Sequence, residues 1–264
     1  MSDRLTREAI LAALETAFVG RNLEVYDAIG STNARAVDWA HEDAPDGALV
    51  IADEQTAGRG RLGRRWHAPP GSALLFSLVL RPDLTPMQAQ RATMLCSSAA
   101  VEAIGAVTGL TARIKWPNDI VIEGKKVGGV LTELGLAGRE LAFVVVGMGL
   151  NVNLDPAQIP EALAPPTSLQ AERGAPVPRL PLLAALLQAV EARYTALGQG
   201  WSPHEEWRDH LATLGQPVQV GTPEEVIVGV AEDVNADGAL LVRTPEGALR
   251  TVLVGDVTLR GYRV

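Results

Sequence analysis

The chain has 264 residues, of which 47% are hydrophobic and 20% are charged, and its formal net charge is −8 at pH 7. A chain of this length and composition can bury a substantial core, in one large domain with room for a smaller second one. The acidic balance disfavours nonspecific nucleic-acid binding as the main function, because such binding depends on basic surface that contacts phosphates.

Cysteine usage and hydropathy exclude further classes. Cys96 is the single cysteine, so no internal disulfide can form, and four scattered histidines do not favour a zinc site. Cys96 lies in an apolar helical pattern, where a buried and unreactive thiol is expected. The sequence shows neither a secretory signal pattern nor a run of 18 apolar residues, and we therefore expect a cytoplasmic protein without membrane contact.

Hydrophobic period and capping residues predict the elements of the first part of the chain. These are a helix within 6–18, a strand at 23–29, a helix through 34–39, strands at 49–53 and 72–80, and a helix from 85 to about 107. Ser31 or Thr32 is the expected N-cap of the second helix. The run 72–80 is almost continuously apolar, which is typical of a strand buried on both faces.

The second part of the chain has a different pattern of predicted elements. It gives strands at about 112–115, 120–122, 126–134 and 141–150, a proline-rich connection at 154–181, and helices at about 180–197 and 203–211. From Gln216, short strands surround Asp-Gly and Glu-Gly turns. We therefore expect an α/β fold with a mixed, largely antiparallel central sheet flanked by helices in residues 1–213, and a small SH3-like β-barrel in 214–264.

The loop at 58–67 is rich in arginine and glycine. Four arginines fall within seven positions and no acid lies among them. Arginine presents a planar, permanently charged fork of donors, and glycine lets backbone N–H groups approach a ligand, so the loop should bind an anion and stay mobile until it does. The glycines have the spacing of a dinucleotide-binding fingerprint, but the segment 66–71 cannot open a helix, which argues against a nicotinamide cofactor.

A second polar group comes from two neighbouring segments. Residues 115–119 read Lys-Trp-Pro-Asn-Asp, and residues 125–129 read Lys-Lys-Val-Gly-Gly. Cations, an amide, a carboxylate and paired glycines at strand ends suit a nucleotide site with a divalent cation. Either segment alone could be a polar turn between strands, so it is their combination that favours a site.

Five segments, in this order, resemble the biotin protein ligases. They are Gly30-Ser31-Thr32-Asn33, residues 54–61, residues 115–119, residues 126–133 and residues 147–153. The resemblance spans 26–153, continues weakly at 167–169 and returns at 255–260. It implies that ATP converts biotin to biotinyl-5′-AMP and pyrophosphate, and that biotin then passes to a lysine of a biotin carboxyl carrier protein or domain. Since one anion attacks another, such catalysis needs positioning and charge neutralisation and no enzyme nucleophile.

The resemblance also implies roles for individual residues. The catalytic cations would be Lys126, Arg61 and Arg64, with Lys126 bridging the biotin carboxylate and the α-phosphate. Biotin would be bound by Ser31, Thr32, Gln55, Arg59, Gly60, Lys126 and Gly128. The nucleotide would be bound by Arg61, Arg64, Trp66, Lys115, Asn118, Gly147, Gly149 and Asn151. Asp119 would help to hold Mg²⁺.

Several of these residues have a purely structural alternative. Trp66 could be a core aromatic, Asp119 could only pair with Lys115 or cap a turn, and Ser31 could be only a helix cap. Arg65 receives no role and is expected to be solvated.

The sequence also bears on repressor activity, on alternative functions and on assembly. Bifunctional members of the family carry an N-terminal DNA-binding domain, whereas 30 residues precede Ser31 here, so we expect a ligase with no operator binding and no repressor role. A lipoate or octanoate ligase is the nearest enzyme alternative, and a non-catalytic binding module is the alternative of another class. A homodimer could form by pairing of the strand at 141–150 across a two-fold axis.

Overall fold

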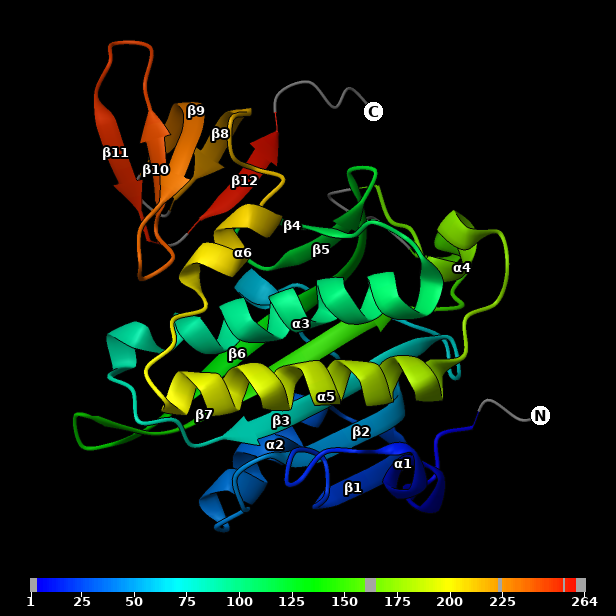
Figure 1. The fold of residues 1–264 in the computed structure, drawn as a ribbon. Helices are drawn as coiled ribbons and strands as arrows, with labels where there is room; N and C mark the ends of the chain where they lie inside the picture. The colour runs from blue at the N-terminus through cyan, green and yellow to red at the C-terminus, as the bar shows by residue number, and fades with distance from the viewer. Residues whose placement is uncertain (1–3, 160–164, 223–224, 254, 260–264) are drawn as a thin grey trace.

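The computed structural model describes residues 4–159, 165–222, 225–253 and 255–259. These residues form two sheets with helices packed mainly on the larger one (Figure 1). The larger sheet has the strand order β1-β2-β3-β7-β6-β5-β4. Its strands are β1 (Leu23–Ile29), β2 (Ala48–Gln55), β3 (Ala73–Leu80), β4 (Arg113–Lys115), β5 (Asp119–Ile122), β6 (Lys125–Ala137) and β7 (Glu140–Asn151). Only β1 and β2 pair in parallel within it, so the expected mixed, largely antiparallel sheet is confirmed.

Helices cover both faces of this sheet. They are α1 (Arg7–Ala13), α2 (Thr32–His41), α3 (Gln90–Thr108), α4 (Leu169–Arg173), α5 (Arg179–Gly198) and α6 (His204–His210). Figure 1 shows α3 and α5 side by side along one face, and α2 lies on the opposite face. The alternation of strand side chains serves both layers: Ile51 and Val146 belong to the large core under α3 and α5, while Val50 and Val145 pack under α2. None of the described helices is long and apolar enough to cross a membrane.

Two helices differ from their expected bounds and one was missed. The first helix ends at Ala13, because Leu14 already has extended backbone angles. The helix expected from residue 85 begins as a 3-10 turn at Pro86–Gln88 before α3 starts at Gln90. Helix α4 lies inside the segment expected to be a simple connection, although Ser168 caps its start and Gly174 its end. Residues 160–164 of that connection lie outside the described residues.

The smaller sheet is antiparallel, with the strand order β11-β10-β9-β8-β12. Its strands are β8 (Pro217–Gly221), β9 (Val226–Val234), β10 (Leu240–Arg243), β11 (Leu249–Val252) and β12 (Asp256–Leu259). In the described part of the chain the edge strands β11 and β12 do not pair, so the expected barrel is an open sheet. The Trp116 indole nitrogen donates to the Gly238 carbonyl oxygen at 2.8 Å and ties this sheet to the larger one.

The proposed mode of dimerisation does not agree with the topology. Strand β7, which contains 141–150, lies in the middle of the larger sheet and pairs with β3 on one side and β6 on the other. Both of its backbone edges are therefore used within one chain, and no partner copy can pair with it. The long apolar run reflects burial at the centre of the sheet rather than an exposed edge.

Candidate active site

A cleft of about 760 Å³ opens where the two sheets meet. Its lining comes from the start of α2, the arginine-rich loop after β2, the β4–β5 turn, β6, β7 and β12. The predicted site residues that line it are Ser31, Thr32, Gln55, Arg59, Gly60, Arg61, Arg64, Trp66, Lys115, Asn118, Asp119, Lys126, Gly147, Gly149 and Asn151. Gly128 is the one predicted site residue that does not line the cleft. It is buried, and a Cβ there would lie 2.9 Å from the Gly149 carbonyl oxygen. This volume suits a small-molecule ligand.

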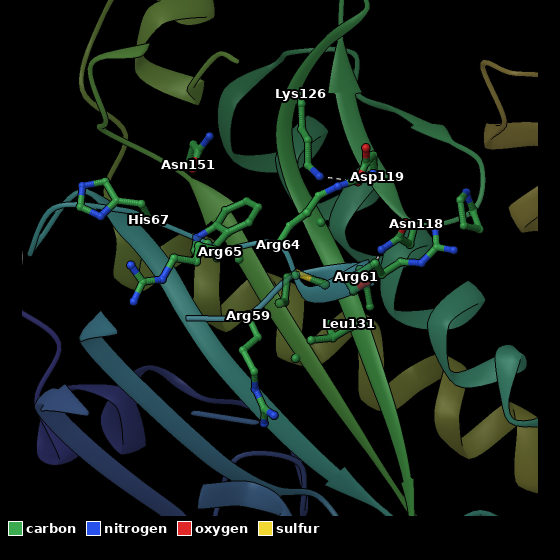
Figure 2. Close-up of a pocket in the computed structure, with 18 of the residues that line it drawn as sticks. Arg59, Arg61, Arg64, Arg65, His67, Asn118, Asp119, Lys126, Leu131 and Asn151 are labelled. Carbon is green, nitrogen blue, oxygen red and sulfur yellow. Dashed lines mark hydrogen bonds and ion pairs between the residues drawn. The ribbon is translucent and has the colours of Figure 1, made fainter. Parts of the chain in front are cut away.

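Lys126 is held firmly at the start of β6. Its backbone N–H donates to the Pro165 carbonyl oxygen and its own carbonyl accepts from the Thr167 N–H, both at 2.8 Å. Its side chain is 31% exposed, and Nζ lies 2.5 Å from Oδ1 of Asp119 (Figure 2). The ammonium group is thus placed inside the cleft with one carboxylate as its partner, so an anionic ligand could replace that carboxylate.

The arginine-rich loop is folded back on itself. The Gly60 N–H donates to the Arg64 carbonyl oxygen at 2.8 Å, and the Trp66 N–H donates to the Gly58 carbonyl oxygen at 3.0 Å. These bonds give the loop, which was expected to be mobile, a hairpin-like backbone. Arg65 is exposed on it, as expected.

Arg61 closes this loop over the cleft. Its guanidinium donates to Oδ1 of Asn118 and to the Gly255 carbonyl oxygen, each at 3.1 Å. Burial lowers the pKa of Arg61, and the charge of Asp256 opposes that effect. Arg64 forms an ion pair with Asp256. The loop is therefore joined to the β4–β5 turn and to the smaller sheet through its cations.

Lys115 adds another cation to the same end of the cleft. Burial lowers the pKa of its ammonium group, with the charge of Asp119 raising it and that of Lys126 lowering it. Burial of a cation near other cations is unfavourable in the free protein, so a polyanion arriving here would relieve it.

Asp256 is a site residue that sequence reasoning missed. It lies in β12, lines the cleft and pairs with the loop arginines. In the sequence, Asp256 belongs to the segment 255–260, which carries the C-terminal part of the family resemblance. The available signal was the presence of an acid in this segment on a chain whose arginine-rich loop has no acid of its own, because such a loop needs a negatively charged partner elsewhere in the sequence.

Trp66 both lines the cleft and packs against the small apolar cluster of Ala68, Ala73 and Leu75. It is half-buried, and a Cβ on Gly149 would lie 2.5 Å from its Cε2 atom, so the indole lies directly against the strand. Its Nε1 is buried without a hydrogen-bond partner among the described residues. Nζ of Lys126 lies 5.8 Å from the ring. A flat apolar surface beside a cation suits a purine attached to phosphate.

Asn151 and Ser31 each have a structural contact in addition to lining the cleft. The Asn151 side-chain amide donates to the Thr167 carbonyl oxygen at 3.0 Å, and its Oδ1 is buried without a partner among the described residues. Ser31 is the N-cap of α2, since its Oγ accepts from the Ala34 N–H at 3.4 Å. The capping prediction is confirmed.

Cys96 plays no part in this site. It is 1% exposed within α3, and burial raises the pKa of its thiol to about 12. Such a thiol is not a nucleophile at neutral pH.

The absence of a side chain at Gly147 is required by its neighbour. A Cβ there would lie 1.8 Å from Oδ1 of Asn33, which is itself buried. We expect Gly147→Ala to lower the free energy of unfolding by about 1–3 kcal/mol, because Asn33 must leave its place. Urea denaturation would measure this. Gly198→Ala is the matched control, since nothing lies within 4 Å of a Cβ at that position. Equal stability of the two variants would contradict the expectation.

Comparison with known proteins agrees with this arrangement. A model of the biotin/lipoate A/B protein ligase family matches residues 25–151, and a model of the biotin protein ligase C-terminal domain matches residues 213–260. The chain is 34% identical to the bifunctional ligase/repressor BirA of Bacillus subtilis, over 97% of this chain and 79% of that protein. It is 36% identical to the biotin–[acetyl-CoA-carboxylase] ligase of Paracoccus denitrificans, over 82% of this chain and 92% of that protein.

The fold gives the same result. A biotin protein ligase from Aquifex aeolicus, solved in complex with biotin and ATP, superimposes with a TM-score of 0.76 at 30% identity. The match covers 91% of this chain and 99% of that one. The arrangement of both sheets is therefore shared with a ligand-bound relative.

Proposed function

The chain belongs to the biotin protein ligases, and on this premise we propose that it attaches biotin to a carrier protein in two steps. In the first, a biotin carboxylate oxygen attacks the α-phosphorus of ATP, and pyrophosphate leaves to give biotinyl-5′-AMP. In the second, the amine of a carrier lysine attacks the acyl carbon, AMP leaves, and an amide bond forms. The carrier would be a biotin carboxyl carrier protein or domain.

One observation carries this proposal: the cleft has two chemically different ends. Arg61, Arg64, Lys115 and Lys126 gather at one end from separate segments of the chain. At the other end, Thr32 and Gln55 offer uncharged hydrogen-bonding groups. A ligand with a neutral polar head and a reacting carboxylate would therefore lie with its carboxylate among the cations, where ATP phosphates also bind.

The residues of the chain account for the chemistry of the first step. Two anions repel each other, and we propose that the charge of Lys126 neutralises both the attacking carboxylate and the α-phosphate. Arg61 and Arg64 would hold the phosphates, and Trp66 would cover the adenine. We propose Asn118, Asn151, Gly147 and Gly149 as nucleotide contacts, and Ser31, Arg59 and Gly60 as biotin contacts.

The residues of this site fit a Mg²⁺ ion that enters bound to the phosphates of ATP. Within the described ranges, no three His, Cys, Asp or Glu side chains gather into a metal cage. The acids in the cleft lining are Asp119 and Asp256, each paired with a cation. Mg²⁺ in nucleotide sites typically uses one or two carboxylates together with phosphate oxygens. We propose Asp119 as its protein ligand; the metal would supply neutralisation of phosphate charge.

Other properties remain part of the proposal. We propose that the enzyme acts in the cytoplasm, where ATP and carboxylases occur, and that it has no repressor function, in keeping with its net charge of −8. We propose residues 214–264 as a second domain that supplies Asp256 to the cleft. Any homodimer would have to use a surface other than the edges of β7.

The first experiment measures pyrophosphate release by the purified protein with ATP and Mg²⁺, in the presence of biotin, lipoate or octanoate. Hydroxylamine traps an acyl-adenylate and allows turnover without a carrier. We expect pyrophosphate release with biotin and none with lipoate or octanoate. Release with lipoate or octanoate alone would contradict the proposal and favour the lipoate branch, and no release with any acid would favour a binding module.

A further inference from the structure

Beneath the end of the cleft formed by Thr32 and Gln55 runs a hydrogen-bonded chain of polar side chains, of which Glu133, Asn33 and Ser77 have no role in the two-step reaction. It connects Glu133 on β6, Asn33 and Thr32 on α2, Ser77 on β3 and Gln55 on β2. Thr32, Asn33 and Ser77 are each at most 5% exposed. Buried hydroxyl and amide groups lie together in an apolar sheet only at a cost, unless each hydrogen atom has a defined acceptor.

The carboxylate fixes the orientation of the first amide. Asn33 Nδ2 donates to Oε2 of Glu133 at 2.7 Å and to the Leu131 carbonyl oxygen at 3.3 Å. Both partners are acceptors, so only the NH₂ group of Asn33 can face them. The amide oxygen must then face the opposite way, toward Ser77.

This orientation decides where the hydroxyl hydrogens go. Ser77 Oγ lies 2.6 Å from Asn33 Oδ1 and 2.8 Å from Thr32 Oγ1. An amide oxygen can only accept, so the single hydrogen of Ser77 goes to Asn33. Ser77 then presents a lone pair to Thr32, and on the other side Gln55 Oε1 lies 3.0 Å from Thr32 Oγ1. Both protein neighbours of the Thr32 hydroxyl therefore draw its hydrogen away from the cleft.

The pocket surface that results has a fixed polarity. Thr32 Oγ1 is left with a lone pair toward the cleft. The Gln55 oxygen also accepts from the Thr32 backbone N–H at 2.7 Å, which leaves the Gln55 NH₂ group as a donor. An acceptor beside a donor matches a cyclic urea, whose N–H donates and whose carbonyl accepts.

Glu133 also extends the chain to the arginine-rich loop. Its Oε1 lies 3.6 Å from Nη2 of Arg59. Figure 2 shows Arg59 pointing away from Lys126 and Asp119, whereas Arg61 ends beside Asn118. One carboxylate thus anchors the loop and orients the amide below the pocket.

We propose that Glu133, Asn33 and Ser77 are positioning residues that set the hydrogen-bond polarity of the pocket, so that Thr32 accepts from a ureido N–H of the substrate. The inference rests on the proposed function, because it takes biotin as the ligand. Ser77 itself is not part of the cleft lining. Its effect on the ligand passes through Thr32.

The test compares two ligands by calorimetric titration of the whole protein without ATP. One is biotin, and the other is a biotin analogue in which the ureido N–H groups are replaced by oxygen, which can only accept. We expect the wild-type protein to bind biotin at least about 100-fold more tightly than the analogue, because two acceptors would face each other. In Ser77→Ala, the Thr32 hydroxyl loses the nearer of its two inward acceptors and keeps only Gln55 Oε1 at 3.0 Å, so its hydrogen can turn toward the cleft more easily and the ratio of the two affinities should fall to about tenfold.

Matched variants separate polarity from packing. Ser98→Ala removes another fully buried serine hydroxyl, one without a hydrogen-bond partner among the described residues, and should keep the wild-type ratio. Glu133→Gln retains an acceptor for Asn33 and should keep the wild-type affinity ratio. Glu133→Met removes the nearer of the two acceptors that orient the Asn33 amide and leaves only the Leu131 carbonyl oxygen at 3.3 Å, so the ratio should fall. A pocket that is merely loosened would bind both ligands more weakly and leave their ratio unchanged.

The outcomes are distinct for the two proposals. Failure of the wild-type protein to bind biotin would overturn the proposed function. Binding of biotin with an unchanged ratio in Ser77→Ala and Glu133→Met would overturn only the assignment of polarity, as would equal binding of both ligands by the wild-type protein.

Discussion

Replacing Lys126 with alanine should lower the rate of biotinyl-AMP formation by about 100-fold or more, the loss typical when a preorganised charge-stabilising group is removed. The Lys126 backbone is held by hydrogen bonds to Pro165 and Thr167, and its ammonium group lies in the cleft 2.5 Å from a carboxylate oxygen of Asp119. In the variant, the attacking carboxylate and the α-phosphate would meet without that charge, and Asp119 would add a further uncompensated negative charge. Single-turnover formation of the adenylate measures the effect.

The neighbouring lysine provides the control for this variant. Lys125 carries the same charge one residue earlier, but its ammonium group lies 2.9 Å from Oε1 of Glu172 and its side chain is 47% exposed. Lys125→Ala should therefore form the adenylate within about twofold of the wild-type rate, since surface ion pairs contribute little. A rate close to wild type in Lys126→Ala would remove Lys126 from the reacting centre.

Much of the central sheet could be predicted because the signals were local. The strand at 23–29 has the predicted bounds, and the run predicted at 72–80 forms β3 from Ala73 to Leu80, where every residue is buried. Between β5 and β6 the chain turns at Glu123 and Gly124, which both have positive φ angles, and a Glu-Gly pair between two β-prone runs is a local signal of this kind. Pairing partners, in contrast, depend on which strands the whole chain brings together. The run 141–150 has the same apolar texture at the centre of a sheet as at an exposed edge, so its place between β3 and β6 was not predictable.

The site residues also divide into those with a local sequence signal and those that depend on distant contacts. Residues in recognisable segments, such as Lys126 and Arg61, do meet in one cleft. Asp256 and Glu133 were missed as site residues because their importance comes from contacts with residues far away in the sequence. Asp256 contacts a loop 192 residues earlier, and Glu133 contacts Asn33 across 100 residues. An acidic side chain on a strand looks the same in sequence whether it faces solvent or a buried amide.

Replacing Arg61 with glycine should weaken retention of the intermediate more than its formation. The Arg61 side chain joins the loop to Asn118 and to the Gly255 carbonyl oxygen, and these contacts close one side of the cleft. Hydrogen bonds from a charged donor contribute about 1.5–3 kcal/mol each, so losing even one should speed release of biotinyl-AMP by about tenfold or more. The released adenylate would acylate lysines of bystander proteins, and labelling of added serum albumin would measure its escape.

The same substitution at Arg65 isolates the role of the side chain from that of the backbone. Arg65→Gly introduces equal conformational freedom into the same loop, but the Arg65 side chain is exposed, and Figure 2 shows it directed away from Asn118 and Asp119. Bystander labelling should therefore rise in Arg61→Gly and stay near the wild-type level in Arg65→Gly. Equal labelling by both variants would assign the leak to loop flexibility, and background labelling by both would mean that the loop does not retain the adenylate. The expected difference follows from the structure, because of these two side chains Arg61 is the one with side-chain hydrogen bonds from the loop to the β4–β5 turn and to the smaller sheet.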